Sequence, residues 1–277
     1  MISGKTLVIA HLGYPTEAFK APMIYNPWFD SKGIDAVVVP VGVKAENYPA
    51  MVEVLRTITN LRGALVTMPH KVTTAGLVDD LSVTARIAGA ANAVLRRPDG
   101  SLLGDQFDGT GFVNGVLRKG LVLKGARVMV TGCGGVGAAI AASLAAAGVG
   151  EMSLYDVNTA SANTLAERLA HHYPALRVGL GNNDPAGYAL VVNATPMGMK
   201  PGDPMPFDTE RLEPGTFVGE VVMSQAITPL LAAATAKGCR VQQGTDMLFE
   251  MIPAYLEFFG FGQATPEELR AVSTLRY

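Results

Sequence analysis

The sequence predicts an α/β protein with an amino-terminal α/β domain, a second α/β domain, and terminal helices that return to the first. Three observations support this fold class. Short β-rich runs alternate with segments of helical spacing, which is the pattern of layered α/β folds. The chain has 277 residues, enough for two domains with separate cores. Hydrophobic residues make up 49% of the chain and charged residues 17%, so we expect a well-buried interior and little disorder.

The composition argues against several classes of partner and site. A formal net charge of −2 gives no sign of a basic face for nucleic acid. Cys133 and Cys239 are far apart and lie in no Cys/His cluster, so we expect neither a disulfide framework nor a metal site. No apolar run approaches the roughly 20 residues that span a bilayer. We therefore expect a cytoplasmic protein with no membrane partner, either a monomer or a homodimer.

The elements of the first domain follow from periodicity and turn residues. Residues 6–10, 36–41, 63–68 and 93–96 have strand composition, and residues 48–60 have helical spacing. The tetrapeptide Arg97-Pro98-Asp99-Gly100 is typical of a turn and predicts a hairpin that closes this half of the chain. A helix over residues 109–118 then leads into the second domain.

A glycine-rich segment, Val-Thr-Gly-Cys-Gly-Gly-Val-Gly at residues 130–137, identifies the second domain. It joins a predicted strand at 126–131 to a predicted helix at 138–147. Such a turn needs residues without a Cβ, so that backbone N–H groups and the helix N-terminus face a pyrophosphate. Asp156 follows the next strand about 20 residues on, where a ribose ligand is expected. This context predicts a Rossmann-fold dinucleotide site that includes Gly132, Gly134, Gly135, Val136, Gly137 and Asp156.

The remaining elements complete this domain and return to the first. Further strands are predicted at residues 151–156, 176–180, 189–193, 216–222 and 239–243. Residues 199–214 contain four prolines and predict a loop. Residues 244–260 have helical spacing, and a capping box of Thr265 and Glu268 opens a last helix. We expect a substrate-binding domain over residues 1–104, completed by 244–277, and a dinucleotide-binding domain over residues 105–243.

Seven short motifs extend this interpretation over nearly the whole chain. They are Gly13-x-Pro15 with Pro22 and Asn26, Val66-Thr67-x-Pro69-His70-Lys71, Gly89-Ala90-x-Asn92, Asp108-Gly109-x-Gly111, the glycine turn, Asn193-Ala194-Thr195-Pro196-Met197-Gly198-Met199, and Gly244-x-x-Met247-Leu248. In this order they resemble the shikimate dehydrogenase family. Each motif is weak alone, and their shared order is strong evidence. The resemblance implies an NAD(P)-dependent dehydrogenase that interconverts an alcohol and a ketone on shikimate, quinate or a related cyclic hydroxy acid.

The resemblance also implies roles for individual residues. Lys71 and Asp108 match the catalytic pair: an amine with a tuned pKa shuttles the hydroxyl proton, and the carboxylate orients it. Thr67 and Asn92 match ligands of substrate hydroxyls, although isolated Thr and Asn residues often serve turns instead. The further positions that match the cofactor site are Asn158, Thr195, Val221, Gly244 and Met247.

The substrate-binding positions depart from the family pattern. Two serines that hold the substrate carboxylate in the family are replaced by Phe19 and Ala21. Apolar residues also replace polar ones at Leu65, Phe107, Met223 and Met251. A polar group loses affinity when its hydrogen-bond partner is removed, so we expect poor activity on shikimate itself and a related, less polar ring as an alternative substrate. Lys20 either replaces the missing anion contact or points into water.

Charge near the ribose position indicates the cofactor. Asp156 is followed by Val157 and Asn158, with no arginine to receive a 2′-phosphate, so NAD is favoured and NADP is possible. Two other functions stay open. One is a non-catalytic or regulatory dinucleotide-binding protein, in which the altered substrate positions reflect lost turnover. The other is a folate-linked dehydrogenase of similar architecture, which the run of motifs makes less favoured.

Overall fold

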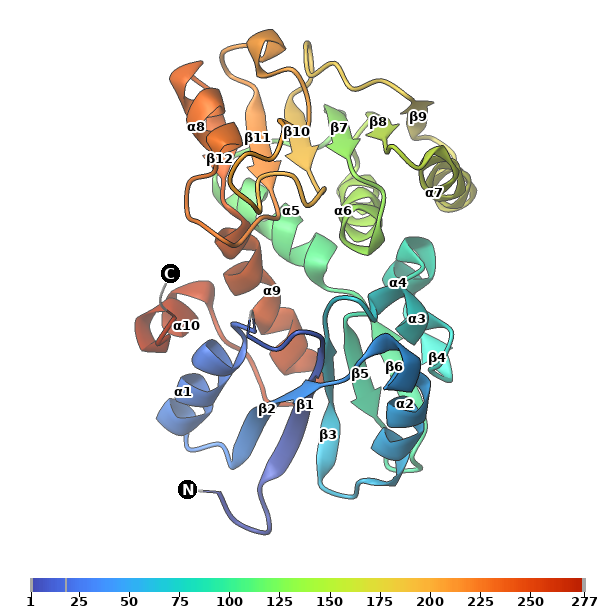
Figure 1. Ribbon diagram of the computed structural model, residues 1–277, viewed down its shortest axis with the longest axis vertical. Helices are drawn as coiled ribbons and strands as arrows, with labels where there is room; N and C mark the ends of the chain where they lie inside the picture. Colours follow the sequence, from blue (N-terminus) through green and yellow to red (C-terminus); the bar gives the residue numbers. More distant parts are fainter. Residues whose placement is uncertain (1, 18, 276–277) are drawn as a thin grey trace. The chain divides into compact units, whose positions relative to one another are not determined.

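A computed structural model describes residues 2–17 and 19–275. The chain divides into two compact units, shown with their elements in Figure 1. The first unit runs up to Phe107 and resumes at Ile252, and the second extends from Asp108 to Met251. The sequence had placed these boundaries after residues 104 and 243.

The first unit contains a six-stranded mixed sheet with the order β2-β1-β3-β5-β6-β4. Its strands are β1 (Leu7–Gly13), β2 (Ala36–Gly42), β3 (Leu61–Val66), β4 (Asp80–Leu81), β5 (Ala93–Arg96) and β6 (Leu102–Asp105). β1 is parallel to both β2 and β3, whereas β5 is antiparallel to β3 and β6. The predicted hairpin joins β5 to β6, and Gly100 adopts a φ of 86° in its turn.

The helices of the first unit cover this sheet and bury its apolar side chains. They are α1 (Pro22–Lys32), η1 (Ala45–Asn47), α2 (Tyr48–Thr57), α3 (Lys71–Ala75), α4 (Val83–Ala88) and α10 (Pro266–Val272). Tyr48, Val52 and Leu55 of α2 pack with Leu12 and Ala64 in one buried cluster. Their spacing is that of one apolar helix face, as the sequence predicted.

The terminal helix returns to the beginning of the chain. The capping box of Thr265 and Glu268 opens α10. Glu268 also forms an ion pair with Lys32 at the end of α1, and the N–H of Thr274 donates to the carbonyl of Met23. The expectation that the chain's last helix packs on the first domain is confirmed.

The second unit contains a six-stranded parallel sheet with the order β12-β11-β10-β7-β8-β9. Its strands are β7 (Arg127–Thr131), β8 (Glu151–Tyr155), β9 (Arg177–Leu180), β10 (Leu190–Asn193), β11 (Phe217–Glu220) and β12 (Arg240–Gln242). This is the Rossmann order, in which the chain reverses direction across the sheet between β7 and β10. All six predicted strands are present, with ends that differ by one or two residues.

The helices of this unit are α5 (Asp108–Arg118), α6 (Gly135–Ala146), α7 (Thr159–His172), η2 (Thr209–Arg211), α8 (Pro229–Ala236) and the first part of α9 (Gly244–Phe258), which continues into the first unit from Ile252. α5 packs against α6, where a Cβ at Gly109 would lie 2.0 Å from the carbonyl oxygen of Ala139. Likewise, a Cβ at Gly111 would lie 2.6 Å from the Cβ of Met251. These close approaches explain why α5 and residues 244–251 belong to the second unit.

Within residues 2–17 and 19–275, no helix combines the length and apolar character that crossing a bilayer requires.

Candidate functional site

The glycine turn between β7 and α6 brings backbone groups into close contact. Gly132 has a φ of 96°, and a Cβ there would lie 2.8 Å from the carbonyl carbon of Ala194. A Cβ at Gly137 would lie 1.8 Å from the carbonyl oxygen of Gly132. In contrast, nothing among the described residues lies within 4 Å of a Cβ built on Gly134, the N-cap of α6. Gly135 and Val136 follow as the first residues of α6, so the open space adjoins a helix N-terminus that suits a phosphate.

Asp156 is fixed beside this turn by its own hydrogen bonds. Its carboxylate accepts the N–H of Cys133 at 2.6 Å and the N–H of Asn158 at 2.8 Å. The side chain of Asn158 in turn caps α7, where it accepts the N–H of Ala160. Asp156 thus lies beside the glycine turn, as the sequence predicts. Its hydrogen bonds to the backbone of the turn were not predicted.

The other predicted cofactor residues follow the carboxyl ends of β10 and β11. The Thr195 hydroxyl donates to Oδ1 of Asn193 at 2.6 Å, and the N–H of Val221 donates to the Asn193 carbonyl at 3.2 Å. A Cβ at Gly244 would lie 2.2 Å from the carbonyl oxygen of Val222, so this position also requires glycine. Met247 is buried in α9 of the same unit. Asn193 therefore accepts hydrogen bonds from both Thr195 and Val221. This role of Asn193 was not predicted from the sequence.

Glu220 is a second group that the sequence did not single out. It ends β11 opposite Asn193 in the strand register and has no exposed surface. Burial raises its pKa from the usual 4.5 to about 7, with opposing contributions from Thr228 and Asn193. The sequence feature that could have identified this buried carboxylate is its position as a lone acidic residue within an otherwise apolar predicted strand.

Lys71 begins α3 in the first unit, five residues after the end of β3. The carbonyl of Lys71 accepts the N–H of Ala91 at 2.8 Å. His70 beside it is structural, because its ring stacks on Tyr48 at 3.8 Å and Nε2 contacts the carbonyl of Val43 at 2.7 Å. Among the described residues, no group of three or more His, Cys, Asp or Glu side chains could hold a metal ion.

Asn92 is placed next to the segment that leads to Asp108. Its Oδ1 accepts the N–H of Phe107 at 2.9 Å, and its carbonyl accepts the N–H of Val66 at 2.7 Å. The Nδ2 of Asn92 is buried and has no hydrogen-bond partner among the described residues. A buried amide donor of this kind costs stability unless a ligand satisfies it. Asp108 itself is buried as the first residue of α5.

Phe19 takes part in an aromatic pair that the sequence did not predict. Its ring stacks on His11, with centroids 4.0 Å apart and planes at 26°. Burial, together with the charge of Lys71, lowers the His11 pKa from 6.5 to about 4, so this imidazole is neutral at physiological pH. The first unit therefore holds His11, Phe19 and Lys71 in one neighbourhood. Lys20 is half-buried and already has an interaction partner.

The predicted residues thus fall into two groups by unit. Those in the first unit are Thr67, Lys71, Asn92, Phe19 and Lys20. Those in the second unit are Asp108, Met251 and all the cofactor positions. Met251 lies in α9 against Gly111.

Cys133 lies in the glycine turn but is not a reactive thiol. Burial raises its pKa to about 12, and Asp156 adds to this effect. A helix N-terminus favours a thiolate in general, but burial and the adjacent carboxylate have the larger effect on the Cys133 pKa.

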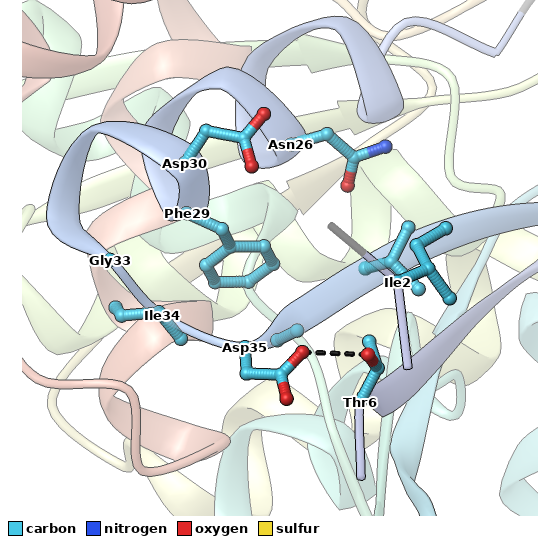
Figure 2. A pocket seen from close by; sticks show the side chains of 10 residues that line it. Ile2, Thr6, Asn26, Phe29, Asp30, Gly33, Ile34 and Asp35 are labelled. Atoms are coloured by element: carbon cyan, nitrogen blue, oxygen red, sulfur yellow. Dashed lines mark hydrogen bonds between the residues drawn. The ribbon is translucent and has the colours of Figure 1, made fainter. Parts of the chain in front are cut away.

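A pocket of about 520 Å³ lies elsewhere, at the amino ends of β1 and β2 (Figure 2). Asp35 and Thr6, which are hydrogen-bonded to each other, line it together with Phe29 and Asp30 of α1. None of the predicted site residues is among its lining residues. Ligand sites of α/β folds form at the carboxyl ends of the strands, so this pocket is not the candidate site.

Family models match both halves of the chain. The model of the shikimate dehydrogenase substrate binding domain matches residues 12–94, which include Phe19, Lys71 and Asn92. A model of the ThiF family matches residues 117–172, the segment from before β7 to the end of α7.

Relatives and solved structures cover nearly the whole chain. The shikimate dehydrogenase (NADP(+)) of Rubrobacter xylanophilus is 38% identical over 251 residues, covering 89% of this chain and 88% of the relative. That of Rhodospirillum rubrum is 33% identical and covers 98% of both chains.

Three solved structures are similar in fold as well as in sequence. Shikimate 5-dehydrogenase from Listeria monocytogenes, in complex with shikimate and NAD, has a TM-score of 0.89 at 27% identity and covers 98% of this chain and 97% of that chain. Quinate dehydrogenase from Corynebacterium glutamicum, in complex with NAD, has a TM-score of 0.86 at 27% identity and covers 96% and 98%. The 5-ketofructose reductase of Gluconobacter has a TM-score of 0.86 at 25% identity and covers 98% of each chain. The chain therefore belongs to the shikimate dehydrogenase family of NAD(P)-dependent oxidoreductases that act on CH–OH groups.

Proposed function

We propose that this protein interconverts a secondary alcohol and a ketone on a cyclic polyhydroxy acid or a related, less polar ring, with weak activity on shikimate itself. The observation that carries the proposal is that the chain keeps the family's lysine at Lys71, whereas the substrate-binding position at Phe19 differs from the family pattern. The lysine keeps its place at the start of α3, while an aromatic ring at Phe19 occupies a position where the family carries a serine.

Lys71 and Asp108 are the proposed catalytic pair. Bound nicotinamide supplies a hydride acceptor, and the substrate hydroxyl must lose its proton as its carbon loses hydride. Lys71 takes that proton, and it returns the proton in the reverse direction. Asp108 orients the amine and bonds a neighbouring substrate hydroxyl. The unpartnered Nδ2 of Asn92 is suited to bond another hydroxyl, and Thr67 adds a further polar group.

NAD is the proposed cofactor of choice. Asp156 holds a negative charge beside the glycine turn, where it suits the 2′-hydroxyl of NAD and repels the 2′-phosphate of NADP. Val157, the next residue, is 82% exposed and offers no positive charge to that phosphate. The glycine turn fits a pyrophosphate, because Gly134 leaves its backbone open to a ligand.

A panel of hydroxylated ring compounds, assayed with NAD and NADP for reduced cofactor, tests this function. We expect turnover with NAD on at least one ring compound and at most slight turnover of shikimate. Replacement of Lys71 by alanine should lower kcat at least 100-fold and leave the Kd for NAD within about twofold, because general acid–base catalysis contributes typically 10² to 10⁴-fold. Lys124→Ala, an exposed lysine of the second unit, is the matched control.

The alternative is a non-catalytic or regulatory dinucleotide-binding protein. The apolar residues at Phe19 and Ala21 favour it, since they remove the family's substrate contacts. Tight NAD binding with no turnover across the panel would support this alternative. Equal losses of turnover and NAD affinity in Lys71→Ala would contradict the catalytic role of Lys71.

A further inference from the structure

A compact group of side chains lies at the carboxyl ends of β1 and β3. We call it the Phe19 cluster, formed by His11, Gly13, Phe19 and Thr67. His11 and Phe19 stack, as described above. A Cβ built on Gly13 would lie 2.8 Å from Cζ of Phe19 and 2.5 Å from Cγ2 of Thr67, so glycine is needed where ring and methyl group meet. The N–H of Thr67 donates to the carbonyl of Leu12, which joins the two strand ends.

The Phe19 cluster contains no charged side chain of its own, although the positive charge of Lys71 acts on His11. Burial and the Lys71 charge keep the His11 imidazole uncharged above a pKa of about 4. His11 is 8% exposed, and its Nδ1 has no hydrogen-bond partner among the described residues. Lys20, the nearest cation along the chain, already has a partner. A carboxylate placed here would lose water without gaining the two hydroxyl donors that the family resemblance places at positions 19 and 21, and Thr67 would supply the one hydroxyl of the cluster.

The cluster has a second property that favours a neutral ring. The face of a phenyl ring packs against C–H groups of a saturated ring, and its negative partial charge disfavours an anion. The Nδ1 atom of His11, buried and unsatisfied, offers one hydrogen bond to a hydroxyl or carbonyl group. A ring that combines an apolar face with hydroxyl groups at its edge would satisfy both features.

We propose that the Phe19 cluster is the specificity-determining wall of the substrate site, and that the substrate is a cyclic polyol or its ketone with no carboxylate at this position. This inference rests on the proposed function and narrows its substrate class. His11 and Phe19 are the residues that set the preference. Lys71 and Asp108 keep their proposed roles in proton transfer.

Shikimate and its methyl ester form a matched pair of probes, because they differ only in the charge of the carboxyl group. We expect the wild-type protein, with NAD, to use the methyl ester at least tenfold more efficiently than shikimate, in kcat/KM. A carboxylate-free cyclitol such as myo-inositol extends the comparison. A wild-type preference for shikimate over its ester would overturn the inference.

A double substitution tests the cluster directly. Phe19→Ser with Ala21→Ser restores two hydroxyl donors, and we expect it to raise kcat/KM for shikimate at least tenfold while lowering that for the ester. The control is Glu17→Ser, which adds a hydroxyl at an exposed position of the same segment. Unchanged selectivity in the folded double variant would also overturn the inference.

His11→Leu provides an independent variant, because it fills the position with an apolar side chain and removes Nδ1. We expect a rise of at least threefold in KM for the ester, with the KM for NAD unchanged. A fall in stability without a change in KM would assign His11 a purely structural role and remove it from the proposal.

Calorimetric binding separates this inference from the proposed function. With NAD present, we titrate the unaltered protein with shikimate and with its methyl ester. If no compound of the panel is oxidised and the ester still binds more tightly than shikimate, the proposed function fails, whereas the preference of the Phe19 cluster for an uncharged ligand holds. If shikimate binds more tightly, or if neither compound binds, the inference fails.

Discussion

At the scale of single residues, Glu220 is the buried group with the clearest consequence for stability. It has no exposed surface and lies between the carboxyl end of β10 and the N-cap of α8, Thr228. Its pKa is about 7 in the folded protein and 4.5 in the unfolded chain. The folded state therefore binds more protons than the unfolded state between these two values. Stability contributed by this group is complete below pH 4.5 and decreases as pH rises to about 7.

Replacement of Glu220 by glutamine should remove this pH dependence. Because one pKa unit corresponds to about 1.4 kcal/mol, the loss in the wild type between the two pKa values is about 3 kcal/mol at most. Hydrogen exchange of the amides in β10 and β11, at pH 5 and pH 8, measures it. The Glu213→Gln control concerns an exposed carboxylate and should retain the wild-type dependence. An equal pH dependence in Glu220→Gln would show that another group is responsible.

Asp156 and Val157 are the residues that we expect to determine the preference for NAD over NADP. Asp156→Asn removes the negative charge and keeps one of the two oxygens that accept the N–H groups of Cys133 and Asn158, while Val157→Arg adds a charge for a 2′-phosphate. We expect the double variant to shift the ratio of kcat/KM for NAD to that for NADP at least 100-fold towards NADP. Steady-state kinetics with both cofactors measures this ratio. Val157→Lys alone, which keeps the repelling carboxylate, should give a smaller shift.

At the scale of elements, the turn between β7 and α6 separates two roles of glycine. Gly137 permits the close approach of α6 to Gly132, whereas Gly134 borders open space. We expect Gly137→Ala to destabilise the protein by about 1–3 kcal/mol, the usual cost of overpacking. Gly134→Ala should leave stability within about 0.5 kcal/mol and weaken NAD binding at least tenfold, because its methyl group lies where the phosphate approaches. Thermal unfolding and NAD titration of both variants test this, and the reverse pattern would contradict it.

The elements also show what the sequence could and could not predict. Strand periodicity and the spacing from Gly132 to Asp156 were sufficient for the Rossmann order, because that topology follows from local pattern and right-handed crossovers. The stack of His11 on Phe19 was not predictable, because the sequence from residue 11 to residue 19 has no period that would place one ring on the other. The raised pKa of Glu220 depends on burial by neighbouring strands, which a single sequence does not specify.

At the scale of the whole molecule, all the predicted cofactor residues lie in the second unit. A ligand that binds only the folded state stabilises it by about 2.7 kcal/mol at a concentration 100 times its Kd. We expect NAD to slow hydrogen exchange chiefly in segments around residues 132–137, 156–158 and 193–195, with a smaller effect in β1 and β2. Exchange with and without NAD, followed by mass spectrometry, measures this. Protection strongest in β1 and β2 would contradict the assignment of the cofactor site.

The division of the chain has a consequence for synthesis on the ribosome. The second unit is continuous in sequence, whereas the first needs its last segment, in which Glu268 pairs with Lys32 and Thr274 bonds Met23. Domains fold as units while the nascent chain lengthens. The second unit is therefore complete once residue 251 has left the exit tunnel, whereas the first, although its synthesis begins earlier, acquires its full core only after the segment from residue 252 onward has also emerged.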